Sequence, residues 1–431
     1  MKLSGRLKQK LAGINISSIA FFAVSIISIT LAWFAYTNTV SSNMNINLKS
    51  WDVKVKKNNT ELNNTFSINI NDLYPGMNDF SDTYTIHNNG DLDAKITYNI
   101  TYFRIFDTEI TRTNGISFAQ LSRDYPFDLE LSHQSRFLEA GSSSSFTVSC
   151  TWPFNSGNDA LDTQYGQLAY DFYQNEQQLH AQNSSYIMRS GLELKIEIVI
   201  SQYIDETNSF ATDSWDTIEL AVEKGDTSKY NVGDTKIVSM DVDLDGTNEN
   251  YTVRIANKST NSNCNNVNHS QTACGFVVEF ADIITTMSMR ETYINYDGYP
   301  ATRVYSYLNN NLESYLPVDL QNVLAKTRVI SGGGKYETYY ITTDRLYLLS
   351  GVEVSGSSSH DRAASTTTQL SYYQNSSNRT IKQLHMSNDC WWLRAAYDDT
   401  YEHFHNIDYY GSLSIRFANE SCGVSPAFRI S

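Results

Sequence analysis

A strict alternation of apolar and charged side chains is the feature that most constrains how this chain folds. The stretch LELKIEIVI, residues 192–200, puts five aliphatic residues at alternate positions with three charged residues between them. Because successive side chains of a β-strand point to opposite faces, this pattern predicts a strand with one face in a core. KITYNITYF, residues 95–103, repeats the pattern, and turn sequences such as Pro75-Gly76 separate such segments. Residues 36–204 are therefore predicted to form an all-β sandwich.

The second half of the chain mixes helical and strand patterns. SWDTIELAVEKGD opens with Ser214 as an N-cap and closes at Gly225, which predicts a helix. ATRVYSYLNNNLESYL carries apolar residues at four-residue steps, and the strand-like KYETYYITT follows it. Residues 214–431 are predicted to be a second, α+β domain, joined to the first by a polar linker at residues 205–213. The fold class predicted for the whole chain is α+β.

The N-terminus carries a basic and then an apolar segment. Four basic residues among the first ten precede INISSIAFFAVSIISITLAWFA, residues 14–35. Such a run indicates a membrane segment whose basic end stays in the cytoplasm. Residues 1–35 are predicted to be a signal peptide or a transmembrane helix, and bulky Trp33 near the cleavage position favours the retained anchor. The protein is expected at a bacterial cell surface with an extracellular C-terminus, or secreted if the segment is cleaved.

Charge and cysteine content limit the partners and the compartment. The net charge of −15 argues against nucleic acid, because phosphates require a basic surface. Export permits disulfides, and five cysteines are present. Cys264 and Cys274 flank an Asn-rich loop, and Cys390 and Cys422 bracket an aromatic segment, so these pairs are favoured, although other pairings stay open. Cys150 is left over.

One acidic turn has the spacing of a calcium loop. DVDLDGTNENY places Asp241, Asp243 and Asp245 at alternate positions, followed by a glycine and Glu249. Alternate carboxylates can converge on one ion, and the glycine permits a sharp turn. The twelfth position is Thr252 instead of a bidentate glutamate, so an acidic hairpin turn is the alternative. Calcium is the one cofactor that the sequence suggests.

No catalytic motif stands out, and no catalytic residue is assigned. Gly332-Gly333-Gly334 lacks the serine or threonine and the following helix of a phosphate loop, so it is predicted to be a hairpin tip. His403 and His405 would share a face of a strand and could bind a metal ion, although histidines on a polar loop are the commoner case. The chain is therefore expected not to be an enzyme.

Two stretches of the predicted sandwich carry a family likeness. They are NDLYPGMNDFSDTYTIHNNGDLDAKITYNI, residues 71–100, and WPFNSGNDALDTQYG, residues 152–166. The first resembles secreted bacterial sandwich domains, and the second is similar to a stretch of the camelysin and TasA-like matrix proteins of Gram-positive bacteria. The resemblance implies a β-sandwich that builds surface layers, fibres or stalks.

A second likeness extends from Trp215 to the C-terminus. It is carried, in order, by SWDTIELAVEKGDTSKYNVGDTK, YTVRIANKS, CGFVVEFADIITTMSM, YPATRVYSYLNNNLESYLPVDLQNVL, DRLYLLSGVEVSG, CWWLRAAY and CGVSPAFRIS. These segments resemble a family of domains of unknown function common in secreted proteins of gut Firmicutes. The chain departs from the usual Trp-Trp-Leu-Arg-Ser-Pro at Ala395 and Ala396.

The closing segment of that family is similar to C-type-lectin-like folds. This group includes relatives of the formylglycine-generating enzyme and the variable proteins of diversity-generating retroelements. The resemblance implies a C-type-lectin-like α+β domain in which Trp391 and Trp392 form a central core strand. It also implies that Arg394 partners a buried carboxylate or carbonyl, and that residues 423–428 return as the last strand beside the tryptophans.

Residues 396–421 have the composition of a recognition segment. They are rich in Tyr, Asp, His, Asn and Ser and show little aliphatic periodicity. Tyrosine gives rigid contact area with a polar tip, and Asn and Ser adapt to varied ligands. The retroelement likeness implies that this segment is hypervariable; an ordinary polar surface is the alternative. The predicted contact face consists of Tyr397, Asp398, Asp399, Tyr401, His403, His405, Asp408, Tyr409 and Tyr410.

The function expected from these observations is ligand binding at a cell surface. A sandwich stalk would present the lectin-like domain, in the manner of an adhesin, to an unknown protein or glycan on another cell, a phage or a host. The alternative is a structural surface, matrix or pilus-like subunit without a specific ligand. An enzyme of the formylglycine-generating kind ranks third and would need a reactive cysteine pair.

Overall fold

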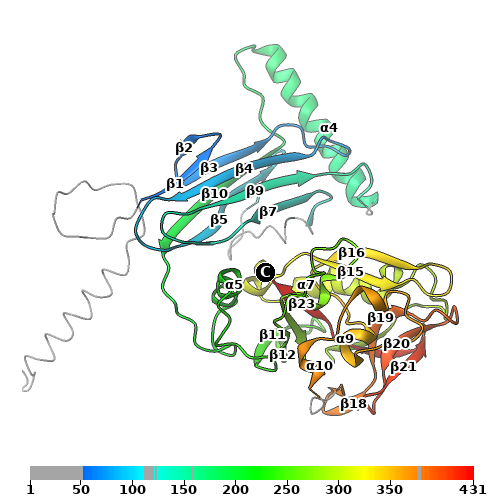
Figure 1. Ribbon diagram of the computed structural model, residues 1–431. Coiled ribbons are helices and arrows are strands. Elements are labelled where there is room, and N and C mark those ends of the chain that lie inside the picture. The colour runs from blue at the N-terminus through cyan, green and yellow to red at the C-terminus, as the bar shows by residue number, and fades with distance from the viewer. Residues whose placement is uncertain (1–51, 111–120, 122–123, 157–158, 376–379) are drawn as a thin grey trace, which may run out of the picture. The chain divides into compact units, whose positions relative to one another are not determined.

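A computed structural model describes residues 52–110, 121, 124–156, 159–375 and 380–431 (Figure 1). The elements between residues 52 and 205 form one compact unit, and residues 206–431 form a second. The structure is mostly β-sheet, with 37% strand and 20% helix, so the predicted α+β class is wrong. Both units have a sheet framework, and the helices of the second unit are short.

The predicted transmembrane helix is not supported either. No helix in the part of the chain that the structure describes is long and apolar enough to cross a membrane. The segment 1–35, to which that prediction belongs, lies outside the described residues.

The first unit consists of two antiparallel sheets and one long helix. The sheet orders are β2-β1-β4-β9-β7 and β3-β10-β5-β6, and β8 also pairs with β5. The strands are β1 Val53–Lys57, β2 Thr60–Leu62, β3 Thr65–Ile70, β4 Phe80–Asn88, β5 Ala94–Ile105, β6 Thr108–Ile110, β7 Asp128–His133, β8 Phe137–Leu138, β9 Ser143–Thr151 and β10 Leu192–Gln202.

Strand β10 shows how the alternating sequence builds this unit. Its aliphatic side chains at alternate positions are buried, and the residues between them are half-buried. Aromatic rings from the two sheets meet in the space between them: Phe66 of β3 lies 4.9 Å from Tyr84 of β4, and Tyr98 of β5 lies 4.9 Å from Phe146 of β9. Contacts of this kind are those of two sheets packed face to face.

Helix α4, Asp159–Gln182, interrupts the predicted all-β region. It buries Ala169, Phe172 and Glu176, and the Glu176 carboxylate pairs with Arg189 at 2.7 Å. Trp152 fixes the start of the helix, because its indole Nε1 donates to Asp162 at 3.1 Å. The helix carries few apolar residues on its buried face, which is why an apolar periodicity does not reveal it.

The second unit has two larger sheets and two hairpins. The sheets have the orders β11-β12-β13-β23 and β14-β22-β19-β20-β21, while β15 pairs with β16 and β17 with β18. The strands are β11 Thr235–Met240, β12 Glu249–Asn257, β13 Phe276–Phe280, β14 Thr285–Ser288, β15 Thr327–Gly332, β16 Tyr339–Asp344, β17 Lys382–Leu384, β18 Ser387–Asp389, β19 Trp391–Ala396, β20 His403–Ile407, β21 Leu413–Phe417, β22 Ser421–Val424 and β23 Ala427–Ile430.

Short helices connect these strands. The predicted cap of α5 is present: the Ser214 side chain accepts from the Thr217 amide, and Gly225 ends the helix with φ 74°. The predicted linker 205–213 carries Phe210 and Asp213, which are buried in the second unit. The helices are α5 Trp215–Lys224, η1 Gln271–Ala273, η2 Tyr299–Ala301, α6 Arg303–Tyr307, η3 Leu308–Leu312, α7 Glu313–Tyr315, α8 Val318–Val323, α9 Gly351–Ser355, η4 Ala364–Thr366 and α10 Ser371–Gln374.

Strand β19 is the centre of the second unit. All six of its residues are buried, and the adjacent tryptophans serve two cores, because Trp391 and Trp392 belong to different apolar clusters. Strand β22 runs parallel to β19 through the pair Trp391 and Gly423, whereas β23 pairs with β13. The tryptophans are therefore structural, as the sequence predicts.

Both predicted disulfide pairs are present. Cys264 is bonded to Cys274, with Cα atoms 5.9 Å apart, and Cys390 is bonded to Cys422, with Cα atoms 5.5 Å apart. Cys150 is free and buried in the first unit. The second bond ties the start of β19 to β22, so it fastens the two strands that carry the tryptophan core.

Candidate ligand-binding site

The predicted contact residues divide between two loops at opposite ends of β20. Loop 397–402 joins β19 to β20, and turn 408–412 joins β20 to β21. The five residues of β20 separate the two loops by about 16 Å. The first loop carries Tyr397, Asp398, Asp399 and Tyr401, and the second carries Asp408, Tyr409 and Tyr410. The structure therefore does not bring the predicted face together as one surface.

The two predicted histidines lie on β20, and their side chains contact residues of the first loop. His405 is 2% exposed, and burial lowers its pKa. Its ring lies 5.4 Å from that of Tyr397. His403 packs on Phe417 at 4.3 Å and pairs with the Thr400 hydroxyl at 2.7 Å. Among the described residues, neither histidine belongs to a group close enough to share a metal ion.

Three exposed tyrosines converge beside the first loop. Tyr296, Tyr336 and Tyr401 are 41%, 64% and 39% exposed, and we call them the tyrosine surface. The ring of Tyr296 lies 5.2 Å from that of Tyr336, nearly at a right angle, and 6.1 Å from that of Tyr401. A hydrogen bond with Tyr336 raises the pKa of Tyr296. Such rings offer apolar faces and polar tips to a ligand.

The three tyrosines come from segments far apart in the sequence. Tyr296 lies in the irregular segment after β14, Tyr336 in the tip of the β15–β16 hairpin, and Tyr401 in loop 397–402. Of these, only Tyr401 was predicted as a contact residue. The sequence signal for Tyr296 and Tyr336 is the high tyrosine content of YINYDGYP and KYETYY. Composition alone does not indicate that these two stretches lie beside the C-terminal segment.

Buried Asn295 holds the loop that carries Tyr401. Its side-chain Nδ2 donates to the carbonyls of Tyr397, Thr400 and His403 at 3.1, 3.1 and 2.9 Å. Its backbone amide donates to the Tyr401 carbonyl at 2.8 Å. Because one side chain satisfies three loop carbonyls, the loop is fixed around it and Tyr401 projects from a supported backbone.

Close packing of glycines brings the β15–β16 hairpin to the same place. Gly333 makes a parallel bridge with Ala396 of β19. A Cβ on Gly333 would come within 2.7 Å of Glu337, and one on Gly334, which has φ +78°, would lie 3.2 Å from the Ala396 Cβ. The glycines are buried, so this predicted hairpin tip is tightly packed at its base.

A charged cluster continues the surface along loop 397–402. His360 Nδ1 lies 2.9 Å from Asp398 Oδ1, and Arg362 Nε lies 3.5 Å from Asp398 Oδ2. Arg362 also donates to the carbonyl of Lys335, the neighbour of Tyr336, at 2.8 Å. The His360 ring packs on Tyr397 at 4.8 Å. Asp398 is therefore held by its neighbours, whereas Asp399 is exposed.

The turn at the other end of β20 forms a separate small patch. Asp408 accepts from the amides of Tyr410 and Ser412, both at 2.9 Å, which closes the turn. The rings of Tyr409 and Tyr410 lie 3.9 Å apart, and both are exposed. The contact is between two rings, whereas the tyrosine surface brings three together.

A buried ion pair stabilises the strand behind the tyrosine surface. Arg394 of β19 donates to both oxygens of Glu353 at 2.6 Å and to the carbonyls of Ile330 and Leu348 at 2.9 and 3.0 Å. Thr272 accepts from the same guanidinium at 3.1 Å. Arg394 holds the pKa of Glu353 below its usual value, against the effect of burial. The predicted buried partner of Arg394 is thus a carboxylate, together with carbonyls.

The acidic turn gathers three of its four predicted calcium ligands. Carboxylate oxygens of Asp241, Asp243 and Glu249 lie within 4.8 Å of one another. Asp245 is not in this group; its amide donates to Asp241 and Asp243 at 3.1 and 3.3 Å, which shapes the turn. Three carboxylates fit calcium in type, but calcium takes six to eight oxygens. The group alone does not make a complete site.

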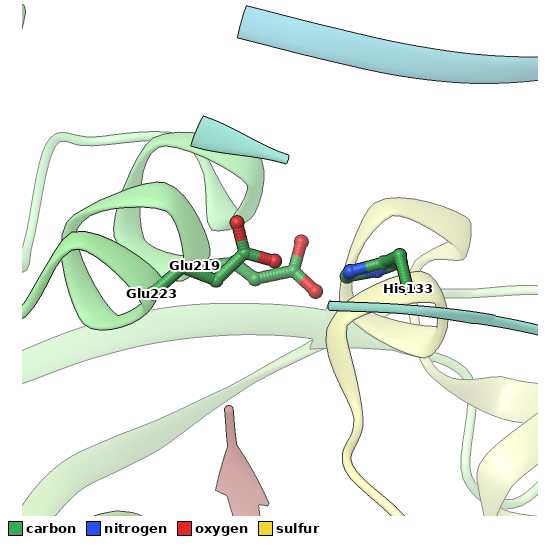
Figure 2. A group of neighbouring side chains, drawn as sticks. All are labelled: His133, Glu219 and Glu223. Carbon is green, nitrogen blue, oxygen red and sulfur yellow. The ribbon is translucent and has the colours of Figure 1, made fainter. Parts of the chain in front are cut away.

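Helix α5 presents another pair of carboxylates. Glu219 and Glu223 project from successive turns of this helix (Figure 2). His133, in the same figure, belongs to β7 of the first unit, whereas both glutamates belong to the second unit. Two carboxylates at this spacing supply too few ligands for a metal centre within the second unit.

Comparison with known proteins adds one finding. A search of curated proteins and a search of solved structures each find no match, so the likeness to C-type-lectin-like folds is not supported. The tyrosine surface lies within a matched region: a domain of unknown function, DUF6273, covers residues 278–431.

Proposed function

We propose that this chain is an extracellular ligand-binding protein whose tyrosine surface is the recognition surface. The observation that supports this proposal is the convergence of Tyr296, Tyr336 and Tyr401 from three separate segments, with exposed rings in contact. Contiguous exposed apolar surface often marks an interaction site. The ligand is a protein or a glycan, because tyrosine faces stack on sugar rings or apolar side chains while the hydroxyls form hydrogen bonds.

The rigidity of the surface favours binding. Ordering a flexible loop costs affinity, so a loop that is already fixed binds more tightly. Asn295 fixes loop 397–402, and the packed glycines fix the hairpin that carries Tyr336. Tyrosine itself has few rotatable bonds, which keeps the entropic cost of contact low.

The two disulfides support an extracellular location. Cys264–Cys274 and Cys390–Cys422 would not persist in a reducing cytosol. In this proposal the first unit serves as a stalk for the binding unit, in the manner of an adhesin.

A further part of the proposal concerns diversification. If a retroelement mutates the segment, substitutions should gather at exposed Asp399 and Tyr401 and spare buried His405. Sequencing this locus in many isolates, and searching beside it for a reverse transcriptase and a template repeat, tests this point. An even spread of substitutions over exposed and buried positions would remove it.

The experiment that tests the function is a binding screen on glycan and protein arrays. The full chain is compared with a variant carrying Tyr296→Ala, Tyr336→Ala and Tyr401→Ala. The matched control carries Tyr409→Ala and Tyr410→Ala, which also removes exposed, touching rings. We expect the first variant to lose the signal by tenfold or more and the control to keep it, because aromatic side chains that become buried under a ligand dominate the binding energy.

Two results would argue against the proposal. Binding that survives the triple substitution would place the ligand elsewhere. Absence of any ligand, together with polymerisation of the purified chain, would favour the structural subunit.

A further inference from the structure

A pocket of the C-terminal unit shares no residue with the tyrosine surface. It is a pocket of about 280 Å³. Its walls are the start of β12, the end of β13 with residues 282–284 that follow it, and the tip of the β17–β18 hairpin. The hairpin is tied to the wall beside it, because Ile283 donates to the Gln383 carbonyl at 3.0 Å and Gln383 donates to Asp282 at 3.0 Å.

The lining combines carboxylates with apolar surface. Glu249 and Asp282 contribute the charge, and no lysine or arginine lines the pocket. Tyr251 and Phe280 supply aromatic surface, and the aliphatic part is lined by Ile283, Ile284 and Leu384. A pocket with negative charge and aromatic faces attracts an organic cation, through ion pairing and cation–π contact.

One oxygen of the Glu249 carboxylate lacks a hydrogen-bond donor. Its Oε2 is shielded from solvent and has no hydrogen-bond partner in the part of the chain that the structure describes. One carboxylate oxygen each of Asp241, Asp243 and Glu249 lie within 4.8 Å of one another, so the two aspartates add like charge beside Glu249. A shielded carboxylate oxygen without a donor is destabilising, so an incoming cation would be bound with a gain in free energy.

The hairpin tip that borders the pocket is strained. His385 and Met386 have φ of 46° and 67°, a conformation in which glycine and asparagine are usual. Met386 is also 89% exposed, which is unusual for a long apolar side chain. Strained backbone conformations cluster at functional sites, and this turn brings a thioether and an imidazole to the lining of the pocket.

We propose that this pocket binds an ammonium or guanidinium group carried on an aliphatic stem. Glu249 and Asp282 pair with the cationic head, and Leu384 and Met386 cover the stem. The same chemistry occurs in a free polyamine-like amine and in the lysine or arginine side chain of a partner protein. Calcium at the acidic turn is the competing outcome.

The test is calorimetric titration of the full chain with agmatine, and in a second arm with acetyl-arginine amide, which stands for a side chain in a protein. Neutral n-butylurea is the control ligand. We expect both cations to bind and butylurea not to bind. Glu249→Gln and Asp282→Asn should each weaken binding about tenfold, while Asp245→Asn, which lies outside the pocket, should change it less than threefold. Agmatine carries two positive charges, so the source of the cation is decided with n-butylguanidinium, a monocation like acetyl-arginine amide. Weaker binding of acetyl-arginine amide than of n-butylguanidinium assigns the pocket to free cations, and the reverse assigns it to a partner protein.

A second variant guards against misfolding as the cause of any loss. His385→Asn with Met386→Gly relieves the strained turn, so it should raise the melting temperature while weakening agmatine binding. The proposal is overturned if neither cation binds, if the Glu249 and Asp282 variants bind as the wild type does, or if calcium alone binds and is not displaced by agmatine.

Discussion

Asn295 is the single residue on which the recognition loop most depends. Its side chain donates to three carbonyls of residues 397–403 and is buried, so water cannot replace it without rearrangement. We expect Asn295→Ala to destabilise the second unit by about 1–3 kcal/mol, because buried carbonyls lose their donor. Amide hydrogen exchange should then be faster in loop 397–403. Asn295→Asp is the matched control for side-chain volume and should disturb the loop as much, since it lacks the donor; undisturbed exchange in both variants would contradict this role.

Asp344 should make the stability of the second unit depend on pH. Burial raises the pKa of this carboxyl to about 6, although Thr342 and Tyr305 donate to it at 2.7 and 2.9 Å. A raised folded-state pKa stabilises the protein below the unfolded value of 3.8, and this contribution is lost as pH rises through 6. Above that pH the buried charge costs up to about 3 kcal/mol.

Asp344→Asn should therefore increase the free energy of unfolding by about 1–3 kcal/mol at pH 8, because the uncharged amide accepts from one hydroxyl and donates to the other. The gain should disappear near pH 4. Denaturant unfolding of both proteins at the two pH values measures it; an equal difference at both would show that the carboxyl is not the cause.

At the scale of elements, the β15–β16 hairpin is positioned by close contact. Gly334 has φ +78° and would bring a Cβ to 3.3 Å from Asn295 Oδ1. Gly225 ends α5 with φ +74° and faces open space. Gly225→Ala should cost only the backbone term, about 1 kcal/mol. Gly334→Ala should cost more and should also weaken ligand binding, because it displaces the hairpin of Tyr336. Equal losses of stability in the two variants, measured by calorimetry, would show that the contact between Gly334 and Asn295 does not contribute to stability.

Elements with strong local patterns could be predicted from the sequence, and others could not. The alternation in β10 and the cap of α5 each depend on residues close together in the sequence, so the sequence predicts them. Helix α4 has no clear apolar stripe, and its burial of Glu176 depends on Arg189, outside the helix. The tyrosine surface could not be predicted from the sequence, because three distant segments form it. Composition instead indicated one contiguous stretch, which β20 divides into two loops.

At the scale of the whole molecule, a count of free thiols tests the two disulfides directly. The chain has five, four are paired, and burial raises the pKa of the Cys150 thiol to about 12. Thiol titration should therefore find none in the folded protein, one in denaturant without reductant, and five after reduction. Three or five thiols in denaturant without reductant would show that a predicted disulfide does not form, which would weaken the case for an extracellular location.

The most direct test of the central claim is a tyrosine-nitration footprint of the full chain with and without the ligand that the arrays identify. Mass spectrometry measures the nitration of each tyrosine. Our account predicts that the ligand protects Tyr296, Tyr336 and Tyr401 and leaves Tyr409 and Tyr410 as reactive as before. Protection of Tyr409 and Tyr410 without protection of the other three would contradict it.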